Sequence, residues 1–159
     1  MINGIYGQQI TFYLSVEEAR IDTSVASSKI QYLCKFTHDL TKDVKYVYAH
    51  LSSATDRSIK FSIAHSTTEL IYLNQLNFKP YGFWTYEVYE VSWIGTPTLT
   101  ASTAPSTETE VLAVNNANGV VQGLVHRGKM KIQETAGSEQ VIYTETSETA
   151  TTNYLYTDY

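Results

Sequence analysis

The alternation of apolar and polar positions along the chain predicts a series of β-strands. In the segment 83–91 one face carries Trp84, Tyr86 and Val88, while the other face mixes polar groups with further rings. A period of two with aromatic and β-branched side chains is typical of a strand in a packed sheet. We therefore expect Trp84, Tyr86 and Val88 to face the core, and Pro80 to mark the turn that precedes the strand.

The same pattern recurs through most of the sequence. Further strands are expected at 9–15, 29–38, 44–50, 58–63, 70–73, 111–114, 120–126 and 129–133. Turn residues at 39–43 join the segments 29–38 and 44–50 into a hairpin. Val16 to Arg20 are expected to form a single helical turn capped by Ser15. The spacing of short strands between turn signals predicts an all-β protein, an antiparallel β-sandwich, with extended terminal arms.

Two stretches lack the alternation. Residues 96–110 are almost entirely Thr, Ser, Ala, Pro and Glu, which predicts a long exposed loop or linker. Residues 135–159 are rich in Thr and Tyr with few apolar anchors, which predicts an extended C-terminal arm, with a frayed terminus as the alternative. The predicted division is therefore an N-terminal strand or arm with a loop at 1–28, a sandwich core at 29–134, and the arm at 135–159.

Composition and charge narrow the classes of function. The chain has 159 residues, 43% of them hydrophobic and 13% aromatic, which suits one folded domain rather than a disordered protein. A net charge of −5 argues against a nucleic-acid surface. No stretch approaches the roughly 20 apolar residues that span a bilayer, so no membrane association is expected. No Lys or Arg follows Lys131, so an acidic end can meet a basic face of another subunit, or both surfaces are simply solvated.

Candidate catalytic and metal-binding residues do not form a recognisable constellation. The four histidines are scattered, and Cys34 is the single cysteine, expected as a buried structural thiol. Glu87 and Glu90 lie three apart on a strand, so they point to opposite faces and are expected as rim charges. No nucleophile elbow or phosphate-binding loop occurs. We expect no enzyme activity, no cofactor and no metal site.

Aromatic residues suggest an interaction surface instead. Trp93, at the end of its strand, is the best candidate for an exposed ring that stacks on a sugar, although a core position is the plainer account of most rings here. In the C-terminal arm, four side chains are candidate anchors on a partner: Tyr154, Leu155, Tyr156 and Tyr159.

Two motifs resemble those of a known group of proteins. They are Gly-Phe-Trp-Thr-Tyr-Glu-Val-Tyr-Glu at 82–90 and Val-Val-Gln-Gly-Leu-Val-His-Arg-Gly-Lys-Met-Lys-Ile at 120–132, and the hairpin at 36–48 adds a third segment. Their succession resembles small β-sandwich virion proteins of tailed bacteriophages, over residues 29–133. The resemblance implies an immunoglobulin-like sandwich with a structural role.

The same resemblance implies partners and a location. The expected function is a capsid decoration or cement protein, made in the host cytoplasm, that stabilises the head by bridging subunits. Its expected partners are the major capsid protein or other virion proteins, and it is expected to form a homo-oligomer. The alternatives are a baseplate or tail-fibre adaptor and, from another class, a carbohydrate-binding adhesin module.

Overall fold

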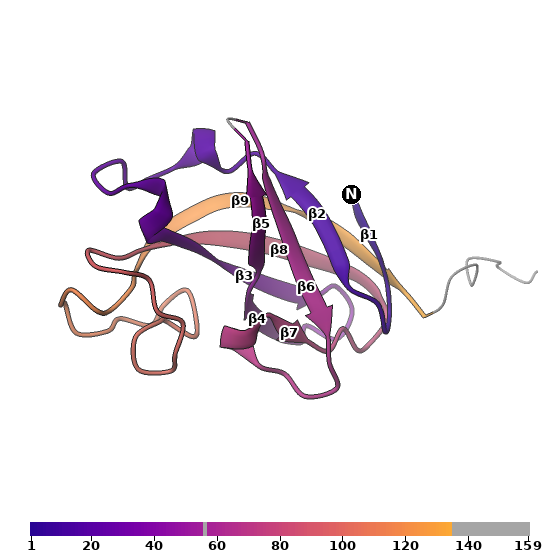
Figure 1. Ribbon diagram of the computed structural model, residues 1–159. Coiled ribbons are helices and arrows are strands. Elements are labelled where there is room, and N and C mark those ends of the chain that lie inside the picture. Colours follow the sequence, from indigo (N-terminus) through magenta and orange to yellow (C-terminus); the bar gives the residue numbers. More distant parts are fainter. Residues whose placement is uncertain (56, 135–159) are drawn as a thin grey trace, which may run out of the picture.

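Two β-sheets pack face to face in the computed structural model, which describes residues 1–55 and 57–134 (Figure 1). The strands are β1 (Ile2–Ile5), β2 (Ile10–Leu14), β3 (Ile30–His38), β4 (Val44–Tyr48), β5 (His50–Ala54), β6 (Ile59–His65), β7 (Gln75–Leu76), β8 (Gly82–Ser92) and β9 (Val120–Gln133). Three 3₁₀ turns accompany them: η1 (Glu17–Ala19), η2 (Ser27–Lys29) and η3 (Ile71–Leu73). The prediction of an all-β sandwich is confirmed, while the immunoglobulin-like arrangement within that class stays a prediction.

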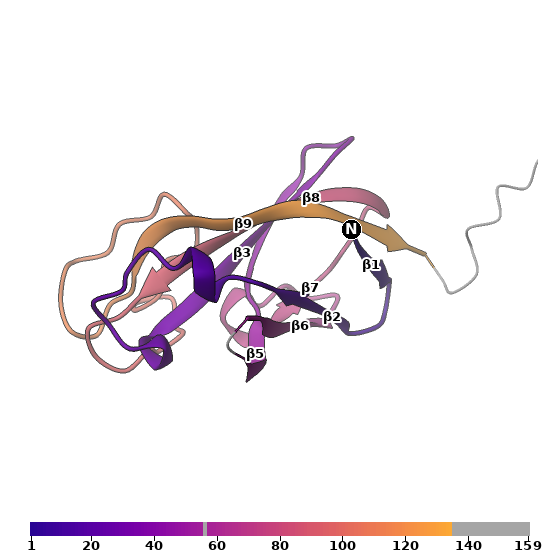
Figure 2. The same cartoon turned by 90° about the horizontal axis from the view of Figure 1, so that it is seen from above.

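The larger sheet has the order β1-β9-β8-β3-β4, and the smaller one has the order β2-β6-β5 with β7 beside β6. Figure 1 shows the strands of the smaller sheet crossing in front of the long strands β8 and β9, and Figure 2 shows the two layers from above. Among the described strands, all pairings are antiparallel except two short ones, β1 with β9 and β6 with β7. The sandwich is therefore mixed at its margins rather than purely antiparallel.

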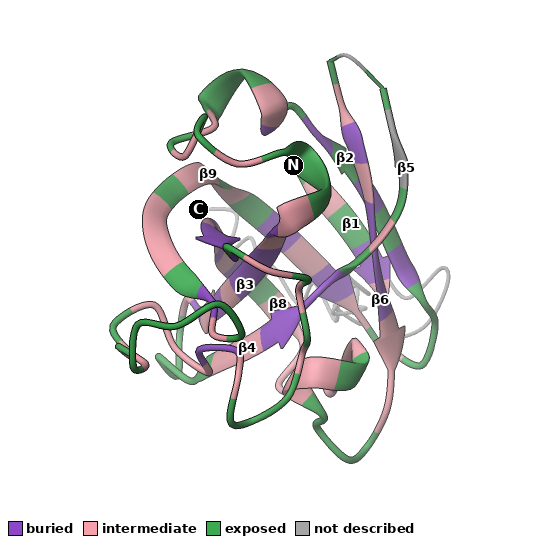
Figure 3. Ribbon diagram, turned by 60° about the vertical axis from the view of Figure 1, so that its left-hand side comes forward, coloured by how far each residue is buried: buried purple, intermediate pink, exposed green. Residues whose placement is uncertain are grey.

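The core lies between the sheets and is largely aromatic. Trp84, Tyr86 and Val88 are buried on the inner face of β8, as their alternation predicted. Rings meet across the two layers, with centroids 5.5 Å apart for Tyr32 and Phe61. Figure 3 shows buried positions along the facing strands and mostly exposed residues in the loops. Burial of such rings is the main source of stability in a domain of this size.

Cys34 lies in the same core on β3. Its side chain is completely buried, which confirms the prediction of a structural thiol. Burial raises the pKa of the thiol to about 12, so the group stays protonated and unreactive at neutral pH.

The first 28 residues belong to the sandwich rather than to an arm outside it. β1 pairs with β9 in the larger sheet, and β2 pairs with β6 in the smaller one. Every second side chain of β2, beginning with Ile10, is buried in the core. Val16 is completely inaccessible to solvent. The helical turn predicted at 16–20 is present as η1, but no side chain caps it, so the cap predicted at Ser15 is wrong.

The hairpin of β3 and β4 is confirmed, but the strand predicted at 44–50 is divided between the sheets. β4 ends at Tyr48 in the larger sheet, and β5 begins at His50 in the smaller one. Ala49, 2% exposed, is the residue at which the chain changes sheet. A small side chain at this point lets the backbone pass through the packed interior, a constraint that local alternation does not reveal.

Three other segment predictions need correction. Residues 70–73 form the 3₁₀ turn η3 rather than a strand, and 111–114 form no strand. The two extended segments expected at 120–126 and 129–133 are one continuous strand, β9, whose pairing with β8 contains two bulges. Gly128 leaves room for the Tyr86 side chain, because a Cβ there would lie 2.5 Å from the Tyr86 hydroxyl oxygen.

Candidate functional site

The long loop at 93–119 packs on the outer face of the larger sheet. A second apolar cluster lies under it, made of Leu33, Tyr48, Val91, Trp93 and Ala104. The stretch 96–110 was predicted to be an exposed loop or linker, and the loop assignment holds, but Ala104 within it is completely buried. The loop therefore adds a third layer over part of the sandwich.

Trp93 lies inside this cluster and is only 1% exposed, so the prediction of an exposed sugar-stacking ring is wrong. The indole packs against the backbone of Gly119, where a Cβ would lie 2.4 Å from a ring carbon. Trp93 follows β8 directly and lies with Leu33 and Val91 on the outer side of the larger sheet. Sequence alternation could not reveal that the loop that begins at Trp93 folds back over that face and brings Gly119, 26 residues further on, against the indole.

Charged and phenolic groups also fasten the loop to the sheet. Lys35 on β3 pairs with Glu108 in the loop, whose other carboxylate oxygen accepts a hydrogen bond from the Tyr46 hydroxyl at 2.6 Å. Although burial alone would raise the pKa of Glu108, these hydrogen bonds hold it below its usual value. Burial and the bond to Glu108 raise the pKa of Tyr46 to about 12. Lys35 also lies 3.6 Å from Glu87.

Glu90 is completely buried, which corrects the prediction that it is a rim charge. Its two carboxylate oxygens accept hydrogen bonds from the backbone N–H groups of Ile21 and Asp22, at 2.9 and 2.8 Å. The carboxylate therefore holds the 20–25 loop against the end of the core. Glu90 shares the inner face of β8 with Trp84, so the strand alternation already contained this signal.

The histidines do not converge on a metal, and none of the described residues forms a group of three His, Cys, Asp or Glu side chains suited to metal binding. His38 is buried, and its ring nitrogens contact the Thr41 hydroxyl at 3.0 Å and the Tyr81 carbonyl oxygen at 3.1 Å. His126 stacks parallel to the Tyr86 ring at 5.7 Å, and burial lowers its pKa. Both rings have structural roles.

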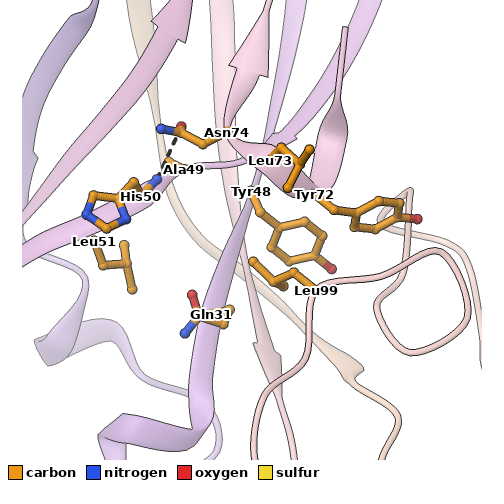
Figure 4. A pocket seen from close by; sticks show the side chains of 9 residues that line it. All are labelled: Gln31, Tyr48, Ala49, His50, Leu51, Tyr72, Leu73, Asn74 and Leu99. Carbon is orange, nitrogen blue, oxygen red and sulfur yellow. Dashed lines mark hydrogen bonds between the residues drawn. The ribbon is translucent and has the colours of Figure 1, made fainter.

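A pocket opens where the chain passes from β4 to β5, with a volume of about 490 Å³. Its lining residues are Gln31, Tyr48, Ala49, His50, Leu51, Tyr72, Leu73, Asn74 and Leu99. Figure 4 shows these side chains gathering from β3, the β4–β5 passage, η3 and the long loop. Asn74 adopts a left-handed backbone conformation, with φ of 60°, and its side-chain oxygen accepts a hydrogen bond from the backbone N–H of His50.

The chemistry of the pocket suits an uncharged group. Its lining contains no Lys, Arg, Asp or Glu. Leucine side chains supply apolar surface, and Leu73 is 65% exposed at the rim. The Gln31 amide and the Asn74 amino group can still donate hydrogen bonds to an entering group. Sequence reasoning missed this pocket, because its residues come from four separate segments and share no motif.

The candidate anchors Tyr154, Leu155, Tyr156 and Tyr159 lie outside the described residues. Among the helical turns of the described chain, none is long and apolar enough to cross a membrane. Comparisons of the chain with protein-family models, with curated proteins and with solved structures give no match.

Proposed function

We propose that the protein is a structural component of a tailed-phage virion, a decoration or cement protein that binds the major capsid protein on the head. The observation that carries this proposal is that the buried ionisable side chains of the protein have a structural role. Within the described chain, the buried His38 and Glu90 both hold loops in place, and the Lys35–Glu108 pair does the same on the outer face. These groups thus serve a rigid scaffold, in keeping with the motifs that resemble virion proteins.

In this function the pocket between β4, β5 and η3 receives an uncharged side chain of the neighbouring subunit. Such a contact combines a buried apolar anchor with a few placed hydrogen bonds, as binding sites on proteins generally do. The energies of individual contacts are small but sum over many copies on a particle. Binding, not chemistry, is the proposed activity.

The baseplate or tail-fibre adaptor remains the second proposal, because the same scaffold and pocket serve either location. The carbohydrate-binding alternative loses its best candidate, since both tryptophans are at most 1% exposed. A sugar-stacking platform needs an accessible ring face.

Mass spectrometry of purified particles from the source of the gene tests the proposal. We expect the protein in stoichiometric amounts, with a particle reconstruction placing it on the head shell. Density on the baseplate instead would support the adaptor. A protein that is abundant in the soluble fraction but missing from particles would contradict any virion role.

A further inference from the structure

A cluster of rings and one cation lies at the end of the sandwich where β9 ends. Tyr6 comes from the turn after β1, His65 from the end of β6, and Lys79 and Tyr81 from the segment before β8. The Tyr6 ring meets the His65 and Tyr81 rings edge-on, at centroid distances of 4.5 and 5.1 Å. The Lys79 ammonium lies 5.0 Å from the Tyr6 ring centroid and 5.9 Å from that of Tyr81.

The cluster offers a cation and several hydrogen-bond donors at the surface. Lys79 is exposed, and no carboxylate among the described residues pairs with it. By contrast, Lys35, Lys45 and Lys129 each pair with a carboxylate. The two phenols and the imidazole can each donate a hydrogen bond beside the ammonium. Such a set favours a carboxylate, which the cation and the neutral donors can bind together.

A source of carboxylates begins next to this cluster. The backbone N–H of Tyr6 donates a hydrogen bond to the carbonyl oxygen of Gln133 at 2.8 Å, so the chain leaves the sandwich beside Tyr6. Beyond this point the sequence contains Glu134, Glu139, Glu145, Glu148 and Asp158 and no Lys or Arg. The six residues from Gln133 to Glu139 reach about 20 Å when extended, which suffices to return to an adjacent site.

We propose that the Tyr6–His65–Lys79–Tyr81 cluster is the docking site for the acidic segment 135–159 of the same chain, through a carboxylate bound by Lys79. A tether this short gives an effective concentration in the millimolar range, well above that of a second copy in dilute solution. The proposal is independent of the virion function, because it concerns the free protein. It gives the predicted C-terminal arm, residues 135–159, a binding site on its own domain.

Zero-length cross-linking of the full-length protein tests the proposal. The carbodiimide EDC joins a lysine amine to a carboxylate as an amide, with loss of water, only when the two groups touch. Lys60 on β6 is the control, because it also lacks a carboxylate partner among the described residues but lies away from the ring cluster. The sample is dilute protein mixed equally from ¹⁴N- and ¹⁵N-labelled stocks. We expect links from Lys79 to segment 135–159 to be about fivefold more abundant than links from Lys60 to that segment. All of these links should join peptides that carry the same isotope.

Links between peptides of different isotopes would show that a second copy supplies the segment and would overturn the same-chain assignment. Equal linking of Lys79 and Lys60 would overturn the site itself. A second measurement avoids the cross-linker: neutralising the segment with E139Q, E145Q, E148Q and D158N should shift the amide NMR signals of Tyr6, His65 and Tyr81. In a Lys79→Met background the same neutralisation should leave these signals unchanged. Shifts that persist there would contradict a role for the ammonium.

Discussion

The Tyr48 hydroxyl donates a hydrogen bond to the backbone carbonyl of Pro105, 57 residues further on, at 2.7 Å. Tyr48 is 1% exposed, and burial raises its pKa, so the phenol remains a donor. This bond connects the edge strand β4 to the long loop. It shows that the loop is part of the folded unit.

Replacing Tyr48 by Phe removes only this hydroxyl. We expect a loss of about 1 to 2 kcal/mol in the free energy of unfolding, because the buried carbonyl of Pro105 loses its donor. Urea unfolding measures the change. Tyr13→Phe is the matched control, since Tyr13 is 63% exposed, and it should change stability by less than about 0.5 kcal/mol. Equal effects of the two substitutions would show that the loop contact contributes nothing.

Glu90→Ala should be one of the most damaging changes of a charged residue. It removes the acceptor of the Ile21 and Asp22 N–H groups, and we expect a loss of about 3 kcal/mol in the free energy of unfolding. Glu87→Gln is the control on the opposite face, where the two ion pairs are 3.6 Å long, and should cost less than about 1 kcal/mol. A small effect at Glu90 would mean that the 20–25 loop holds its position without the carboxylate.

The contact between Trp93 and Gly119 can be tested by a double-mutant cycle. Gly119→Ala places a methyl group against the indole and should cost about 1 to 3 kcal/mol. Trp93→Phe removes the ring atoms that the methyl group meets, so the double variant should be more stable than the sum of the single changes indicates. Chemical denaturation of the four proteins measures the coupling. Strict additivity would contradict the packing described for the loop.

His126 predicts a dependence of stability on pH. Burial lowers its pKa below the unfolded value of about 6.5, so the unfolded chain binds more protons in the interval between the two pKa values. Stability from this group is complete above pH of about 6.5 and decreases as the pH falls through that interval. Unfolding midpoints are measured as a function of pH for the wild type and for His126→Phe, which keeps a ring beside Tyr86. At neutral pH the midpoints of the two proteins should change with pH to the same extent. The variant should lose less stability on acidification, and an identical slope in acid would refute the assignment.

Deletion of residues 138–159 tests the predicted assembly arm. The described strands all lie before this segment, so the thermal midpoint should change by only a few degrees. Retention on particles, measured by co-sedimentation, should fall. Undiminished occupancy would contradict an assembly role, and failure of the truncated protein to fold would mean that the segment belongs to the core.

The sequence by itself determined the strands with a clear period of two. Tyr32, Cys34 and Phe36 on β3, like Trp84 and Tyr86 on β8, are buried where alternation placed them. These predictions are confirmed because burial on one face of a sheet follows from the local sequence, in which every second residue is apolar. The same local signal placed Glu90 on the inner face, although its charge led to the wrong expectation.

The tertiary structure alone decided which faces are covered and where strands end. The apolar run at 111–114 resembles a strand, but a strand exists only where another edge supplies hydrogen bonds, and no strand of the described residues pairs with this run. Trp93 is buried because the loop that follows it folds back over the larger sheet, and the pocket forms only after β3, β5, η3 and the loop come together. Ala49 separates two strands because the chain passes there from the larger sheet to the smaller one. Such features depend on contacts between residues far apart in the chain, which a period of two does not encode.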